Sequence, residues 1–332
     1  MRLSALAAVG AALAVVGTAG GEPEPMPLHG VPLRETGIRV VIAAKSPAVL
    51  DLDSERSTPI AGIPRVDRGF VWVVGVGRSA VVIARDRLYG VHASGPASKL
   101  GPGSEAAPAP DGESVWVKRR VRSSYCTLRR VRLDGRLLRA PRRIRCSWRI
   151  YPGGSLGLGV SSTRIIDPAT GRTVYKAPAE IVAVAGTNVV LHPGAEPGVV
   201  NATSGTGRRL DWPETSGTLF HRWVAAGRLV ALDFANPSWT SEGRYEDDQY
   251  YDAWVVDAER PRVTRLPGMP AFVALKFMNI AWIGDGRLLV LARSGGRYVV
   301  ALWKPGQEHL QVKAVRLPAR PSGVVPSFAA LG

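Results

Sequence analysis

An arginine-rich stretch carries the strongest chemical signal of the sequence. Residues 118–146, KRRVRSSYCTLRRVRLDGRLLRAPRRIRC, hold twelve Lys and Arg residues against one acid, Asp134, and so supply +11 of a formal net charge of +16. Guanidinium groups donate planar pairs of hydrogen bonds, which suit carboxylate, phosphate and sulfate groups. We therefore predict an anion-binding surface; the alternative is a solvated charged face without a partner. The predicted anion-binding residues are Arg119, Arg120, Arg122, Arg142, Arg143, Arg145 and Arg149.

The only two cysteines of the chain lie in the same stretch. Cys126 and Cys146 are twenty residues apart, without a CxxC motif or a paired histidine, which argues against a zinc site or a redox motif. Outside the cytoplasm two such thiols persist as a disulfide where the geometry allows it. We predict a Cys126–Cys146 bridge that joins two arginine-bearing loops; the alternative is two free buried thiols.

A second candidate site is the segment NPSWTSEGRYEDDQYYD, residues 236–252. Carboxylates beside aromatic rings suit sugar binding, and two carboxylates could act as acid and base in glycosidic cleavage. They could also bind Ca²⁺, although the EF-hand spacing is absent. The alternative is a loop that only offsets the basic surface electrostatically. The candidate residues of this loop are Trp239, Tyr245, Glu246, Asp247, Asp248, Tyr250, Tyr251 and Asp252. The five histidines have no metal-binding spacing, so we predict no metal site. We also assign no catalytic residue and no cofactor.

The beginning of the sequence predicts the compartment. A short basic start is followed by an apolar run over residues 3–16 and by small residues at 17–19. This order is typical of a secretory signal peptide, here residues 1–19, and the run is too short for a good membrane span. The alternative is an uncleaved anchor. We expect a secreted, extracytoplasmic protein with no membrane span after cleavage and with a flexible leader over residues 20–37.

Short apolar runs recur along the rest of the chain. Runs such as FVWVVGV (70–76), RLVALDF (228–234) and RYVVALW (297–303) are bounded by turn residues and are typical of β-strands. Gly and Pro total 63 residues, which leaves little room for helices. Every fourth strand ends near a proline: Pro64, Pro102, Pro141, Pro178, Pro213, Pro267 and Pro318. Seven such units predict an all-β fold, a β-propeller of seven four-stranded antiparallel blades. The alternative is two stacked β-sandwiches.

The ends of the repeat predict how the ring closes. The first unit has three strands only, and residues 323–332, GVVPSFAALG, are expected to supply its innermost strand, because pairing them closes the seam. The turn segments IIDPATGRTVYKA (165–177) and APDGESVWV (109–117) resemble those of the bacterial WD-repeat-like and quinoprotein-like, or TolB-like, β-propellers. The resemblance implies one propeller domain over residues 38–332. It also implies a binding site on the face that carries the loops between second and third strands.

These patterns predict the partner only by class. In the third unit, strands over about 114–120 and 137–141 would place both cysteines and the arginines on the binding face. We expect a monomeric, non-enzymatic binding or scaffolding module whose partner is an anionic cell-envelope polymer or a protein. Nucleic acid is disfavoured, because only Tyr125 and Trp148 interleave with the arginines. The alternative function is a carbohydrate-active enzyme, a glycoside hydrolase or lyase, that uses the loop 236–252.

Overall fold

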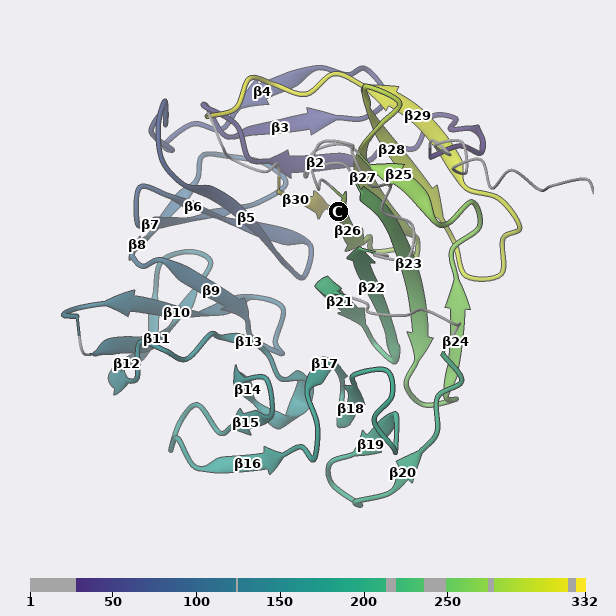
Figure 1. Cartoon of the computed structure of the whole chain (residues 1–332). Helices are drawn as coiled ribbons and strands as arrows, with labels where there is room; N and C mark the ends of the chain where they lie inside the picture. Colours follow the sequence, from purple (N-terminus) through teal and green to yellow (C-terminus); the bar gives the residue numbers. More distant parts are fainter. Residues whose placement is uncertain (1–27, 124, 213–218, 236–248, 274–277, 322–326) are drawn as a thin grey trace, which may run out of the picture.

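The protein is a ring of seven sheets around a central axis (Figure 1). The structure is a computed structural model that describes residues 28–123, 125–212, 219–235, 249–273, 278–321 and 327–332. Within these ranges each sheet contains four antiparallel strands, and two sheets gain a fifth strand. The prediction of an all-β, seven-bladed propeller is therefore confirmed.

The first four blades are built from the following strands, given from the axis outward. Blade 1 contains β30 (Phe328–Leu331), β2 (Arg39–Ile42), β3 (Ala48–Asp51) and β4 (Ser57–Pro59). Blade 2 contains β5 (Val71–Val76), β6 (Ser79–Ala84), β7 (Arg87–Val91) and β8 (Ser98–Pro102). Blade 3 contains β9 (Glu105–Pro108), β10 (Ser114–Arg120), β11 (Cys126–Arg132) and β12 (Leu137–Ile144). Blade 4 contains β13 (Tyr151–Pro152), β14 (Leu158–Ser161), β15 (Arg164–Ile166) and β16 (Thr173–Lys176), with the 3-10 turn η1 (Gly154–Leu156) between β13 and β14.

The last three blades complete the ring. Blade 5 contains β17 (Ile181–Ala185), β18 (Asn188–Leu191), β19 (Val199–Asn201) and β20 (Gly207–Arg208). Blade 6 contains β21 (Leu219–Ala226), β22 (Leu229–Ala235), β23 (Gln249–Asp257) and β24 (Arg262–Arg265), and β25 (Ala271–Val273) also pairs with β23. Blade 7 contains β26 (Met278–Trp282), β27 (Leu288–Ser294), β28 (Arg297–Trp303) and β29 (Gln311–Val315), and β1 (Val31–Pro32) lies outside β29.

The ring closes as the sequence predicts. Strand β30 pairs antiparallel with β2, with Ile42 opposite Phe328 and Arg39 opposite Leu331. The innermost strand of blade 1 thus comes from the far end of the chain, and blade 1 keeps no open inner edge.

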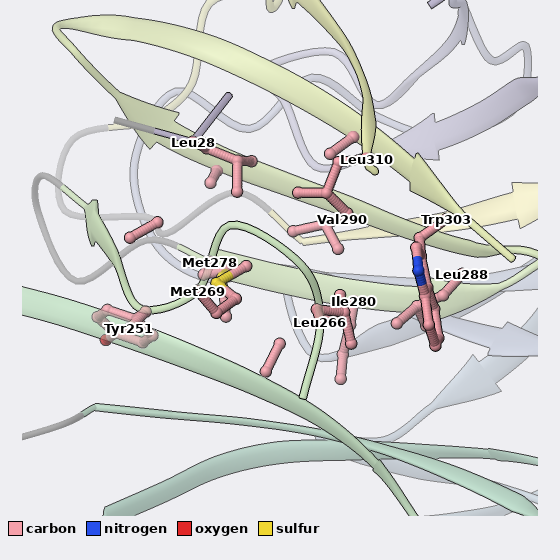
Figure 2. Close-up of a cluster of buried hydrophobic side chains, with 14 of the residues drawn as sticks. Leu28, Tyr251, Leu266, Met269, Met278, Ile280, Leu288, Val290, Trp303 and Leu310 are labelled. Carbon is pink, nitrogen blue, oxygen red and sulfur yellow. The ribbon is translucent and has the colours of Figure 1, made fainter. Parts of the chain in front are cut away.

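The leader differs from the expectation where the structure describes it. Residues 20–37 were expected to be flexible, but β1 pairs in parallel with β29. The amide of Leu28 donates a hydrogen bond of 2.7 Å to Ser294 Oγ, and the Leu28 side chain is buried. The reason is apolar burial: Leu28 packs in the core between blades 6 and 7, near Leu310 and Val290 (Figure 2). Residues 1–27, with the predicted signal peptide, lie outside the described residues.

The blades are apolar on both faces because each blade is covered by two neighbours. Val40 and Val41 are consecutive in β2 and point to opposite faces, yet both are buried. Val40 packs against the blade 7 residue Leu291, whereas Val41 packs against the blade 2 residue Val73. This double coverage explains why the strands read as continuous apolar runs and not as strict alternation.

Aspartates stabilise the turns at one end of the propeller, which we call the aspartate end. Asp111, between β9 and β10, accepts hydrogen bonds of 3.1 Å from the amides of Glu113 and Ser114. Asp167, between β15 and β16, accepts bonds from the Ala169 amide at 2.8 Å and from Thr170 Oγ1 at 2.7 Å. Asp257 forms an equivalent turn between β23 and β24. These carboxylates accept hydrogen bonds from backbone N–H groups that a tight turn leaves without a backbone acceptor.

These turns predict acid sensitivity. The Thr170 hydroxyl and the Ala169 amide hold the pKa of Asp167 below its ordinary value of 3.8. A depressed folded-state pKa means that the stabilisation is present above the ordinary pKa and is lost as the pH falls through the depressed one. We expect the free energy of unfolding, measured with urea, to decrease below about pH 4. Asp167→Asn should show a shallower decrease, because its amide oxygen can still accept the bond from the Ala169 amide and does not titrate. An identical pH dependence in both proteins would contradict this role.

Candidate functional site

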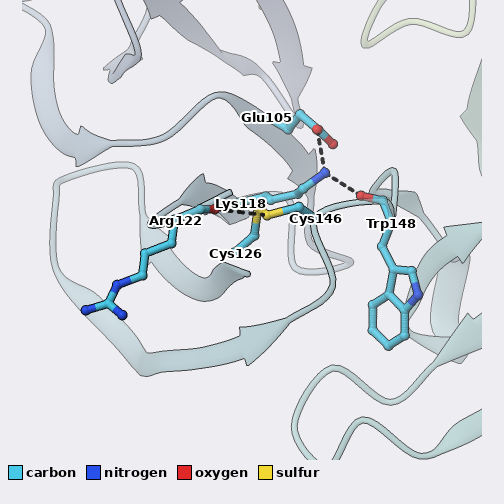
Figure 3. The surroundings of a disulfide bond; sticks show 6 residues. All are labelled: Glu105, Lys118, Arg122, Cys126, Cys146 and Trp148. Atoms are coloured by element: carbon cyan, nitrogen blue, oxygen red, sulfur yellow. Dashed lines mark hydrogen bonds and ion pairs between the residues drawn. A yellow bond between two sulfur atoms is a disulfide. The ribbon is translucent and has the colours of Figure 1, made fainter. Parts of the chain in front are cut away.

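The disulfide holds two loops of blade 3 together (Figure 3). Cys126 begins β11, and Cys146 lies in the segment that follows β12; their Cα atoms are 5.0 Å apart. The bridge therefore joins the loop 121–125 to the segment 145–150, as the sequence predicts. Because neighbouring strands run in opposite directions, both segments lie at the end of the blade opposite the aspartate turns. We call this the disulfide end.

A buried ion pair fixes the same segment. Lys118 Nζ donates a bond of 2.7 Å to Glu105 Oε1 and another to the Trp148 carbonyl (Figure 3). The second oxygen of Glu105 accepts the Ile150 amide at 3.3 Å. The Lys118 side chain is only 5 % exposed, whereas that of Glu105 is 38 % exposed. Two polar contacts and the disulfide thus hold the segment 145–150 against β9, β10 and β11.

Removing the disulfide should destabilise the protein while leaving the fold in place. The bridge closes a segment with a sequence separation of 20, for which chain entropy predicts about 3 kcal/mol of stabilisation. We expect the double variant Cys126→Ser/Cys146→Ser to have a free energy of unfolding, measured with urea, that is about 3 kcal/mol lower than that of the native chain. Treating the double variant with a reductant should change nothing further, whereas the native chain should lose stability. A reductant effect on the variant would contradict the assignment of the loss to this bridge.

Six of the seven predicted arginines project at the disulfide end of blade 3. All six side chains are exposed, and none forms an ion pair with a carboxylate within the residues that the structure describes. We call them the arginine surface: Arg119, Arg120, Arg122, Arg143, Arg145 and Arg149. Arg143 also lies over the Tyr125 ring, with 4.6 Å between the guanidinium carbon and the ring centroid.

Other arginines of the same stretch are neutralised at the aspartate end. Arg130 pairs with Asp111 at 2.8 Å. Arg132 pairs with Glu113 at 3.1 Å and with Asp134 at 3.6 Å. Burial lowers the pKa of Arg129, and the nearby charge of Arg119 lowers it further. Blade 3 therefore separates its charges: the acids of its turns lie at the aspartate end, and the arginines of the disulfide end are exposed to solvent.

Arg142 lies elsewhere than the sequence predicts. The fourth strand was expected to end at Pro141, with Arg142 and Arg143 in a loop, but β12 continues to Ile144. A proline is tolerated here because β12 is the outer edge strand, where a backbone N–H has no ladder partner to lose. The strand places Arg142 opposite Leu128 and Arg143 opposite Thr127, so the two arginines point to opposite faces of the blade. Arg142 is directed toward blade 4, where its guanidinium contacts the Ala169 carbonyl, so it is not counted in the arginine surface.

The acidic loop is only partly described. Trp239, Tyr245, Glu246, Asp247 and Asp248 lie outside the described residues, and Tyr250 belongs to β23. Tyr251 and Asp252 are buried within β23. Burial raises the pKa of Asp252, and its ion pair with Arg265, at 2.5 Å, acts in the opposite direction. Tyr251 and Asp252 therefore stabilise blade 6 and do not reach solvent.

An exposed aromatic pair was missed by sequence reasoning. Phe70 is 55 % exposed and stacks on Trp72, with ring centroids 5.8 Å apart and planes inclined by 9°. Trp72 packs on the core between blades 2 and 3. The run FVWVVGV suggested one buried strand, whereas β5 begins only at Val71. An aromatic residue just before a strand, preceded by charged and glycine residues, was the available signal.

Two further features concern metals and membranes. Among the described residues, no group of three or more His, Cys, Asp or Glu side chains is placed to hold a metal ion. Over the same part of the chain, no helix is long and apolar enough to cross a membrane.

Solved structures share this fold. TolB from Acinetobacter baumannii aligns over 91 % of this chain and 68 % of its own length, with a TM-score of 0.50 and 11 % sequence identity. This chain has the fold of the TolB-like β-propellers. The predicted resemblance is thus confirmed for the TolB-like fold, while such low identity leaves the function open.

Two further solved structures align with this chain at lower TM-scores. A protein from Agrobacterium tumefaciens assigned as a TolB aligns over 84 % of this chain and 89 % of its own, with a TM-score of 0.42 and 12 % identity. A protein from Bacteroides uniformis assigned as a 6-phosphogluconolactonase aligns over 88 % and 100 %, with a TM-score of 0.47 and 10 % identity. No protein family matches the sequence, and no curated protein matches it either. The TolB-like propeller therefore has to be assigned a function from its own surface.

Proposed function

We propose that this protein is an exported binding module whose arginine surface binds an anionic component of the cell envelope or an acidic face of a protein partner. The observation that carries the proposal is the separation of charge in blade 3. Arg130 and Arg132 at the aspartate end are paired with acids, whereas the six arginines at the disulfide end have no carboxylate partner in the described part of the chain. Guanidinium groups that have no described carboxylate partner are available to bind carboxylate, phosphate or sulfate groups of another molecule.

The disulfide and the polar contacts of blade 3 favour a binding role over a role in solubility alone. The disulfide and the Lys118–Glu105 pair hold the segment 145–150 against the blade. Arginines that repel one another are thereby kept at fixed positions, and less conformational entropy is lost when an anion binds. A charged surface that served only solubility would need no such fixation.

The proposed location rests on two observations. A disulfide persists in an oxidising compartment, and the first nineteen residues have the order of a signal peptide. The anions accessible to such a protein are envelope polymers, lipid headgroups and acidic protein surfaces.

The proposal is tested by measuring retention on isolated cell envelopes and on immobilised heparin as a function of salt. We expect the logarithm of affinity to fall linearly with the logarithm of salt concentration, because each bound arginine releases counterions. Retention that does not respond to salt would exclude an electrostatic site and would shift attention to the loop 236–252, which a glycan panel would then test.

A further inference from the structure

A groove of about 420 Å³ lies between the outer strand of blade 3 and the β15–β16 turn of blade 4. Buried Trp116 and Leu128 belong to the core between these blades and form its apolar base. Leu138 of β12 and the pair Pro168 and Ala169 of blade 4 line its sides. The groove thus offers polar and apolar surface side by side at the rim of the propeller, in contact with solvent.

Two arginines provide the charge of the groove. Arg142 points into it from β12, since its position opposite Leu128 directs it toward blade 4. Its Nη1 lies 3.4 Å from the Ala169 carbonyl oxygen, which is a long hydrogen bond. Gly171 leaves room for the guanidinium, because a Cβ atom there would fall 1.9 Å from Nη2 of Arg142. Arg139 lines the same groove.

The described surroundings compensate these arginines only in part, since the charge of Arg139 interacts with that of Asp167. Neither Arg139 nor Arg142 forms an ion pair with any carboxylate that the structure describes. The acid of the adjoining turn, Asp167, already accepts hydrogen bonds from Ala169 and Thr170. Arg130, which lies over the Trp116 ring, is paired with Asp111. A half-buried guanidinium beside an apolar base therefore has capacity for an anionic ligand.

We propose that this groove binds a small carboxylic acid with an apolar body. The carboxylate would pair with Arg142 and Arg139, and the hydrocarbon part would lie against Leu138 and Pro168. The volume is at the lower end of pockets that hold small molecules, so the ligand is small and not a polymer. An inorganic anion would leave Leu138 and Pro168 uncovered, and a neutral hydrocarbon would leave the arginines unpaired. The groove is separate from the arginine surface, so this proposal is independent of the one above.

Octanoate is a suitable probe, and calorimetric titration of the purified protein would measure its affinity. Acetate supplies the charge without the chain, and 1-octanol supplies the chain without the charge. We expect octanoate to bind at about 1 mM or tighter, and both comparison compounds to bind at least about tenfold more weakly. Arg142→Gln should weaken octanoate binding at least about tenfold, because it removes the charge-assisted pair.

Arg143→Gln is the matched control. It removes the same charge from the next residue of β12, but on the opposite face of the blade. Octanoate affinity should stay within about twofold of the native value, since an exposed charge contributes little at this distance. Equal losses in both variants would show general electrostatic attraction and overturn the proposal, as would equal binding of octanoate and 1-octanol. Arg142→Gln should leave retention on heparin unchanged, which separates this groove from the arginine surface.

Discussion

Replacing Arg119, Arg120, Arg143 and Arg145 by glutamine is expected to lower affinity for heparin about 100-fold at near-physiological salt and to flatten the salt dependence by about 3.6 units of slope. The reason is counterion release, since each lost cation removes nearly one unit from the slope of log affinity against log salt. All four side chains are exposed and have no carboxylate partner among the described residues, so their loss should leave the melting temperature nearly unchanged.

The control for this prediction changes net charge equally at the aspartate end. Four exposed arginines occupy turns between third and outer strands in blades 1, 3, 4 and 6: Arg56, Arg136, Arg172 and Arg260. Replacing these by glutamine also removes four positive charges. If position decides, this control should keep most of its affinity and slope. If both quadruple variants behave alike, overall charge and not the arginine surface accounts for retention, and the proposed site is wrong.

Breaking the Lys118–Glu105 pair is expected to have very different effects depending on which partner is removed. Glu105→Ala leaves the ammonium of Lys118, 5 % exposed, with only the Trp148 carbonyl. An uncompensated buried charge of this kind should lower the free energy of unfolding by about 3 kcal/mol. Lys118→Met leaves a carboxylate that is 38 % exposed and can be hydrated, so we expect a loss of about 1 kcal/mol. Urea denaturation measures both losses.

The double variant separates this explanation from a packing effect. Glu105→Ala/Lys118→Met removes both charges, so it should be more stable than Glu105→Ala alone, although it carries one more substitution. Additive losses would mean that the two side chains act independently. We also expect Glu105→Ala to weaken heparin binding, because the segment 145–150 with Arg145 and Arg149 loses one of its attachments, the bond from the Ile150 amide to Glu105.

The fold was predictable from the sequence because its signals are local and repeated. Turn aspartates such as Asp111 and Asp167, and a proline near the end of each fourth strand, recur in every unit or nearly so. Closure by β30 was predictable because the first unit has too few strands. Strand β1 was not predictable: two residues carry no periodicity, and their position depends on Leu28 reaching a core formed by residues far along the chain.

The candidate site was predictable in composition and less so in geometry. The disulfide and its pairing of two loops followed from there being only two cysteines. The contacts of individual arginines could not be predicted from the sequence. Arg130 and Arg142 have the same chemistry and similar neighbours in sequence, yet one pairs with Asp111 and the other enters a groove of blade 4. Such differences depend on strand register and on Pro141 being tolerated at an edge, which composition does not reveal.

Closure by β30 also has a consequence for biogenesis. Strand β30 follows every other described strand in sequence. In a nascent chain that leaves the ribosome or crosses a membrane, blade 1 therefore has three strands until β30 is available. The ring can close only after β30 has been synthesised, and the inner edge of β2 is unpaired until then. Proteolytic removal of residues 328–331 would reopen the ring at that same strand.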